Sequence, residues 1–77
     1  MAGETLRKIL RIRRQIMELE HEYNGLQKDI SVGLQFFPKE IAEGIAKRYI
    51  EVSEQLSRLY YELEKLESSI EYSYGAF

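Results

Sequence analysis

The most regular feature of the chain is a repeat of apolar residues between positions 42 and 70. Their spacing alternates three, four, three, four over about four heptads, which is typical of a helix that packs along one apolar stripe. The residues of this stripe are Ala42, Ile45, Tyr49, Val52, Leu56, Leu59, Leu63, Leu66 and Ile70. The pattern predicts one long helix that needs a second apolar stripe to face it.

A matching stripe occurs in the first part of the chain. Its residues are Ile9, Ile12, Ile16, Leu19, Tyr23, Leu26 and Ile30, again in steps of three and four. Gly33 and Pro38 separate the two stripes. Glycine often ends a helix by adopting a positive φ, and proline fixes the first turn of the next helix. The sequence therefore predicts two helices with a break between them.

We expect a single domain over residues 1–77 with four segments. These are a helix over 5–30, a connection over 31–37, a helix over 38–71 and a tail over 72–77. Thr5 is a candidate N-cap, because its hydroxyl can accept a hydrogen bond from a free amide of the first turn. In the connection, Phe36 and Phe37 are expected to cover the end of the apolar core, since aromatic side chains are usually buried; the alternative is that they form a docking patch.

Two long helices joined by a short connection form an antiparallel hairpin, and pairing the two stripes predicts that Tyr23 faces Tyr49. Charge supports this orientation. Basic residues gather in the first turns of helix one, and acidic residues gather in the last turns of helix two. These are Arg7, Lys8, Arg11, Arg13 and Arg14, and Glu62, Glu64, Glu67 and Glu71. Each cluster opposes its own helix dipole, so an antiparallel hairpin lets one offset the other. The predicted fold class is all-α.

Helix two is expected to extend about two turns beyond helix one, given a rise of roughly 1.5 Å per residue. Leu66 and Ile70 would then have no opposing residue in the same chain, and further apolar residues lie outside the stripes. Exposed apolar surface of this kind is typical of an interface. The expected interface residues are Leu10, Met17, Ile50, Tyr60, Leu66, Ile70, Tyr72, Tyr74 and Phe77. We predict a homodimer of hairpins, which is a four-helix bundle.

Composition limits the chemistry. The 77 residues include no cysteine and one histidine, so thiol chemistry and a structural zinc site are not expected. The net charge is −2. Glu18 and His21 have the Glu-x-x-His spacing of helical metal sites, but they fall at heptad positions c and f, away from the stripe. We expect no catalytic residues, no cofactor and no metal. No apolar run approaches the ~20 residues of a membrane span, and no signal-peptide segment is found, so a cytoplasmic protein without membrane partners is expected.

The basic cluster has three open interpretations. Arg7, Arg11 and Arg14 lie along one side of helix one. They could neutralise the glutamates of helix two, contact the phosphates of a nucleic acid, or bind an acidic protein partner. We favour the first interpretation and keep the other two as alternatives.

The segment Ser53-Glu54-Gln55-Leu56-Ser57, followed by Leu59-Tyr60-Tyr61, resembles the second helix of small helical-hairpin phosphatases that act on a sporulation phosphorelay. That resemblance implies a phosphatase-like regulator. However, Ser57 stands where that family has an aspartate, and we transfer no site residue from it. The function that we expect is a non-enzymatic module for protein–protein interaction and oligomerisation, such as a small adaptor or regulator.

Overall fold

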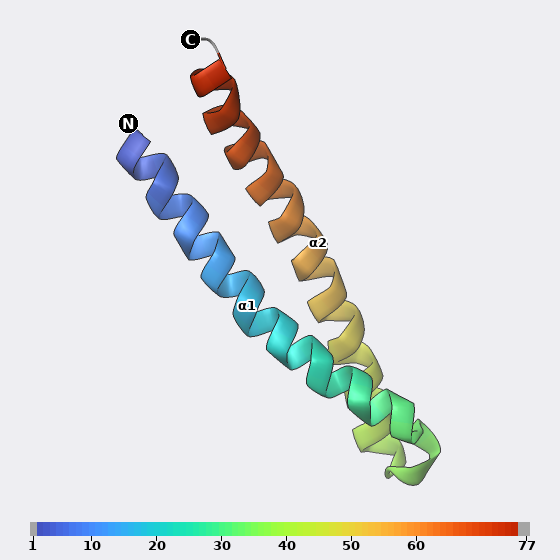
Figure 1. Cartoon of the computed structure of the whole chain (residues 1–77). Coiled ribbons are helices and arrows are strands. Elements are labelled where there is room, and N and C mark those ends of the chain that lie inside the picture. Colours follow the sequence, from blue (N-terminus) through green and yellow to red (C-terminus); the bar gives the residue numbers. More distant parts are fainter. Residues whose placement is uncertain (1, 76–77) are drawn as a thin grey trace.

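The computed structural model describes the backbone of residues 2–75 and the side chains of residues 3–70. Two long helices, α1 (Ala2–Val32) and α2 (Lys39–Gly75), are joined by a 3₁₀ turn, η1 (Leu34–Phe36). The start of α1 and the end of α2 lie at the same end of the molecule, which we call the open end, and the connection lies at the other (Figure 1). The predicted all-helical antiparallel hairpin is confirmed over the described residues.

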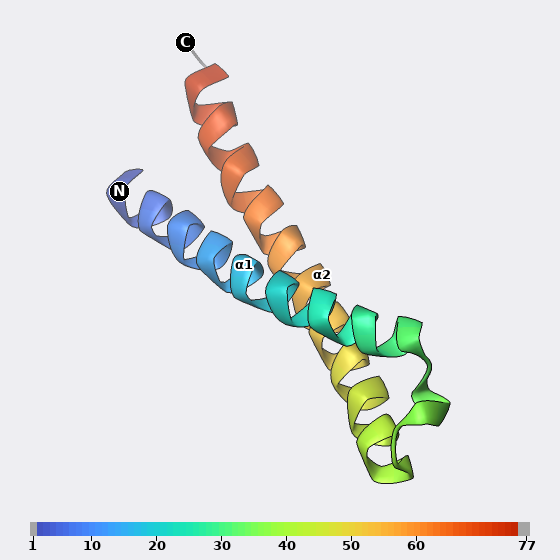
Figure 2. The ribbon, with the colours of Figure 1, turned by 60° about the horizontal axis from the view of Figure 1, so that its bottom comes forward.

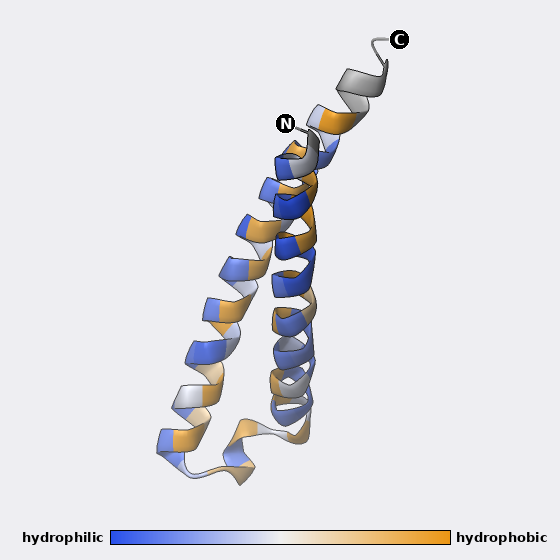
Figure 3. Cartoon of the chain, turned by 90° about the vertical axis from the view of Figure 1, so that its left-hand side faces the viewer, coloured by the Kyte–Doolittle hydropathy of each residue, from blue (hydrophilic) through white to orange (hydrophobic). Residues whose placement is uncertain are grey.

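The core of the hairpin consists of the two predicted stripes. Its buried side chains are Ile9, Ile12, Ile16, Val52 and Leu56, and each belongs to a stripe. Partly buried residues of the same stripes pack against this cluster, namely Leu19, Tyr23, Leu26, Leu59, Leu63 and Leu66. From the α1 side, the outward surface of α1 is mostly hydrophilic, whereas α2 shows hydrophobic segments repeating along its length (Figure 3). Each helix therefore buries only the stripe that faces the other helix.

The register of the two helices agrees with the predicted pairing. The rings of Tyr23 and Tyr49 stack with centroids 5.0 Å apart and planes inclined by 24°. Their hydroxyl oxygens are 2.8 Å apart and share a hydrogen bond. The two helices are inclined to each other. In the view of Figure 2 their ribbons cross near the middle of their lengths.

The helices extend further than the sequence predicted. α1 begins at Ala2, so Thr5 lies inside the helix and is not its N-cap. Glu4 lies in the first turn, where a carboxylate interacts favourably with the helix dipole. At the other end of the chain, α2 includes the backbone of residues 72–75, which were expected to form a non-helical tail. No proline or glycine interrupts the sequence between Lys39 and Gly75 except Gly44, so nothing stops the helix earlier.

The expected overhang of helix two does not include Leu66. Leu66 packs against the core cluster, and Arg13 of α1 forms an ion pair with Glu67 of α2 over 2.6 Å. The prediction that Leu66 has no opposing residue in its own chain is therefore wrong, because Arg13, well inside α1, already lies level with Glu67. Ile70 is also partly buried.

The connection contains one special backbone position. Gly33 has a φ of 114°, as predicted, and its amide donates to the carbonyl oxygens of Asp29 and Ile30. Phe37 is extended, with φ −105° and ψ 152°, as expected before a proline. Pro38 precedes α2, and its carbonyl oxygen accepts a hydrogen bond from the amide of Ala42.

The two phenylalanines of the connection do not cover the core together. Phe36 is 73% exposed, so the prediction is wrong for this residue, whereas Phe37 is partly buried. Within the 3₁₀ turn, Leu34 is the partly buried apolar side chain. Because consecutive residues of such a tight turn point in different directions, burying Leu34 leaves Phe36 directed outward.

We predict that Leu56→Ala lowers the free energy of unfolding by about 2–5 kcal/mol, because it opens a cavity at a side chain that is only 6% exposed. Ile41→Ala on the same helix is the control, since Ile41 is more than half exposed and should change stability by less than about 1 kcal/mol. Urea unfolding followed by circular dichroism measures both. Equal losses for the two variants would contradict the assignment of Leu56 to the core.

Candidate functional site

The hairpin has two side faces, and each is built from one flank of both helices. With the stripes at heptad positions a and d, one flank carries positions b and e, and the other carries positions c and g. The b and e positions include Met17 of α1 and Tyr60 of α2, so we call this side the Met17–Tyr60 face. The c and g positions include Arg48, so we call the opposite side the Arg48 face. Contacts across the hairpin confirm this division on both sides.

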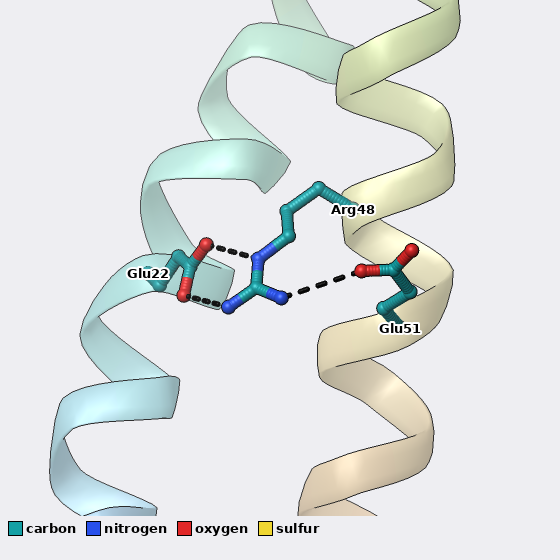
Figure 4. Close-up of polar contacts among 3 residues, drawn as sticks. All are labelled: Glu22, Arg48 and Glu51. Carbon is teal, nitrogen blue, oxygen red and sulfur yellow. Dashed lines mark hydrogen bonds and ion pairs between the residues drawn. The ribbon is translucent and has the colours of Figure 1, made fainter.

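Charged side chains bridge the two helices on the Arg48 face. The guanidinium of Arg48 donates from Nε and Nη2 to the two carboxylate oxygens of Glu22, over 2.5 and 2.8 Å. It also contacts Glu51, one turn along α2, over 3.4 Å. Arg48 thus lies between a carboxylate of α1 and a carboxylate of α2 (Figure 4). A two-pronged contact of this kind fixes geometry more strongly than a single hydrogen bond does.

The hydrogen bonds from Arg48 hold the pKa of the Glu22 carboxyl below its ordinary value of 4.5. They also raise the pKa of the Arg48 guanidinium, so the pair stays ionised. The groove on this face is lined largely by polar side chains. They are Gln15, Glu18, Glu22, Arg48, Gln55, Arg58 and Glu62, together with Leu19 and Leu59 at the bottom.

The Met17–Tyr60 face has a different chemistry. Large apolar side chains stand exposed along it, with Leu10 66%, Met17 72%, Ile50 57% and Tyr60 45% accessible. The groove between the helices on this face is lined by Glu20, Tyr23, Asn24, Ser53, Leu56, Ser57 and Tyr60. Apart from Glu20, its lining is uncharged, and the two serines are small. The face therefore offers apolar knobs beside a groove with small, hydrogen-bonding residues.

Two polar contacts cross the Met17–Tyr60 face. The hydroxyl of Tyr60 donates to the Glu20 carboxylate over 2.6 Å, which raises the pKa of Tyr60. Near the open end, Arg13 donates to Glu67 over 2.6 Å. These contacts show which residues of the two helices lie level with each other along the hairpin.

The structure brings together four of the predicted interface residues. Leu10, Met17, Ile50 and Tyr60 all occupy the Met17–Tyr60 face. Leu66 and Ile70 instead lie on the a/d stripe and are partly buried. The side chains of Tyr72, Tyr74 and Phe77 lie outside the described residues, so their part in an interface stays a prediction.

The difference between the two faces was not part of the sequence-based prediction. Its signal was present, because positions b and e beside the stripes hold Leu6, Leu10 and Ile50, whereas positions c and g hold mainly charged residues. The contact between Glu22 and Arg48 could have been found in the same way. It joins two g positions next to the predicted Tyr23–Tyr49 pair.

The arginine stripe is only partly used within the chain. Arg7, Arg11 and Arg14 are exposed, and none forms an ion pair with another described residue. Arg13, which is not part of that stripe, is the arginine of the cluster that reaches an acidic residue of α2. Among the described residues, only one arginine of the N-terminal basic cluster is therefore neutralised by an acidic residue of α2.

The described side chains, residues 3–70, form no arrangement suited to binding a metal ion. No group of three or more histidine, aspartate or glutamate side chains in this range is arranged to hold a metal ion. Glu18 and His21 are both exposed on α1, and Glu18 belongs to the Arg48 face. Neither described helix has a stretch that is long and apolar enough to cross a membrane.

Comparison of the chain with protein-family models, curated proteins and solved structures finds no match.

We predict that the Glu22–Arg48 contact makes stability depend on acid pH. Because the folded pKa of Glu22 is lowered, its stabilising contribution is fully present above about pH 4.5 and is lost as the pH falls through the lower folded value. Both side chains are more than a third exposed, so solvent screening keeps the effect modest. Unfolding midpoints measured between pH 7 and pH 3 should fall less steeply in Arg48→Gln than in the native chain.

Glu18→Gln provides the matched control, because Glu18 lies in the same groove but forms no ion pair with a described residue. This variant should keep the native acid dependence. An Arg48→Gln variant with an unchanged pH profile would show that the contact has no thermodynamic role.

Proposed function

We propose that this protein is a non-enzymatic interaction module that self-associates through its Met17–Tyr60 face. The observation that carries the proposal is the unequal distribution of exposed side chains. Five of the exposed large apolar side chains lie on one face of the hairpin, namely Leu6, Leu10, Met17, Ile50 and Tyr60, and mainly charged residues occupy the other face. Apolar patches bordered by polar residues are typical of protein interaction sites. A cytoplasmic location, expected from the sequence, is part of the same proposal.

The accessible area of the chain supports a second copy as the occupant of this face. The hairpin exposes 6448 Å². A compact monomeric protein of 9.1 kDa exposes only about 4,900 Å², following the usual scaling of area with mass. The excess of roughly 1,500 Å² exceeds the ~800 Å² that each partner buries in an interface of standard size. Pairing two such faces gives a four-helix bundle, in which each helix buries its b and e positions as well as its a/d stripe.

The chemistry of the groove is suited to helix packing. Ser53 and Ser57 lie one turn apart on α2 and leave room beside Tyr60. A helix of the partner can place its larger side chains into this space, as ridges of one helix fit grooves of another. Binding then requires no reacting group, only apolar contact and satisfied hydrogen bonds.

We predict that Met17→Glu weakens self-association by about tenfold to a hundredfold, because it would bury an additional charged group in the interface. Glutamate favours helices, so the hairpin itself should persist. Ile41→Glu is the control, since Ile41 is also an exposed apolar residue but lies at a g position, on the opposite Arg48 face. Sedimentation equilibrium gives the dissociation constants, and circular dichroism checks helicity. Equal dissociation constants for Met17→Glu and the native chain would contradict the proposal.

A second candidate function is nucleic-acid binding by the arginine stripe. The observation that favours it is the exposure of Arg7, Arg11 and Arg14 without an ion pair to any described residue. Their spacing of four and three places them on one side of α1, where they can contact successive phosphates. Arg7 and Arg14 lie at position f and Arg11 at position c, so most of the stripe stays accessible when the Met17–Tyr60 face is occupied.

The second candidate predicts salt-dependent binding to nonspecific duplex DNA. Each phosphate contact that is lost should reduce the slope of log K against log salt by about 0.9. Changing Arg7 and Arg11 to glutamine should therefore flatten the slope by roughly two, while Lys47→Gln on the outer side of α2 should leave it nearly unchanged. Fluorescence anisotropy measures this binding, and absence of binding at low salt would remove the candidate.

A further inference from the structure

A face that carries two antiparallel helices can pair with its own copy in two symmetric ways. When the two-fold axis runs along the hairpin, α1 of one protomer lies against α2 of its partner, and both connections lie at the same end. We call this the axial arrangement. When the axis runs across the hairpin, α1 lies against α1, α2 lies against α2, and the connections lie at opposite ends. We call this the transverse arrangement. Both pair the same surface with itself, as a two-fold interface requires.

We propose that the second copy binds in the axial arrangement, so that the basic half of α1 faces the acidic half of the partner's α2. This inference rests on the proposed self-association through the Met17–Tyr60 face. An axial two-fold rotation does not change the height of a residue along the hairpin. Residues that lie level across the hairpin within one chain therefore also lie level between the two protomers.

Charges near the open end favour the axial arrangement. Arg13 lies level with Glu67, because the two side chains form an ion pair within the chain. Glu64, one turn before Glu67, is exposed and forms no ion pair with a described residue. In the axial arrangement the partner's Glu64, at position b, lies level with Arg14. Arg14 stands at position f, on the outer edge of the Met17–Tyr60 face, and is also exposed and unpaired among the described residues. This pairing would use one arginine of the stripe and leave Arg7 and Arg11 accessible.

The polar groove residues also find partners in the axial arrangement. The Tyr60 hydroxyl bonds to Glu20, so these two residues mark one level. Met17 lies one turn from Glu20, and it would meet the aromatic ring of the partner's Tyr60, a favourable sulfur–aromatic contact. Asn24 would lie opposite the serines of the partner's groove, where its amide can form hydrogen bonds.

The transverse arrangement lacks this complementarity along α2. It places the acidic half of α2, with Glu64 and Glu67, against the first half of α2 in the partner. Between residues 43 and 57, the b and e positions of α2 include Glu43 and no basic side chain. Carboxylates would therefore face apolar residues or another carboxylate, which disfavours association.

Distance measurement between single spin labels tests the orientation. The chain has no native cysteine, so Gln35→Cys provides one label in the exposed connection of each protomer. In the axial arrangement both labels lie at the same end, and their separation reflects the 17 and 15 Å widths of the hairpin. In the transverse arrangement the separation approaches the 58 Å length. A short distance supports the inference, and a long distance overturns it while leaving self-association intact. A labelled chain that shows no dipolar coupling and stays monomeric by sedimentation up to the highest concentration overturns both.

A charge-reversal cycle provides an independent test of the same contact. Arg14→Glu and Glu64→Arg should each weaken the dimer by about threefold to tenfold at low salt, because exposed ion pairs are modest but occur twice in a symmetric dimer. The double variant should recover most of the native affinity. Lys47→Glu, on the outer side of α2 away from this contact, should leave the affinity unchanged. Strictly additive losses in the double variant would overturn the axial arrangement.

Discussion

Every other feature of this protein depends on the packing of one apolar stripe against another. A two-helix hairpin has a single interface between its helices, so each helix can bury only the side chains that face its neighbour. Ile12, Ile16, Val52 and Leu56 form the centre of that contact. The small width of this core fixes the register of the helices. It also leaves the flanking positions of both helices at the surface, where their chemistry decides what the protein can bind.

The flanking positions on the two sides of the hairpin carry different kinds of side chain. On one side, Arg48 joins carboxylates of both helices, and docking another protein there would require the removal of water from several charges. That desolvation is costly unless the partner supplies matching groups. On the other side, Met17 and Ile50 stand beside a groove with two serines, where burial releases water from apolar surface. For the proposed self-association, the polar face therefore favours contact through the opposite side.

Much of the fold could be predicted from the sequence, because the stripes are long and regular. They identify the buried residues, the antiparallel hairpin and the pairing of Tyr23 with Tyr49, and Gly33 marks the break. The ends of the helices were less predictable, since no strong stop signal precedes Gly75 and Glu4 supports an early start. Phe36 was misjudged because side-chain direction in a short 3₁₀ turn depends on local backbone angles, which composition does not reveal. The sequence also identified Leu10, Met17, Ile50 and Tyr60 as exposed apolar residues, and their b and e heptad positions already indicated the common face that the structure shows.

We propose that a second copy of the chain binds the apolar surface that the single core leaves exposed. Light scattering on the unmodified chain, across a hundredfold range of concentration, tests this claim most directly. The proposed self-association predicts a mass near twice the 9.1 kDa of one chain at the upper end of the range, and a decrease only on dilution. A well-folded species that stays at 9.1 kDa throughout would contradict the claim, because the Met17–Tyr60 face would then be free in solution.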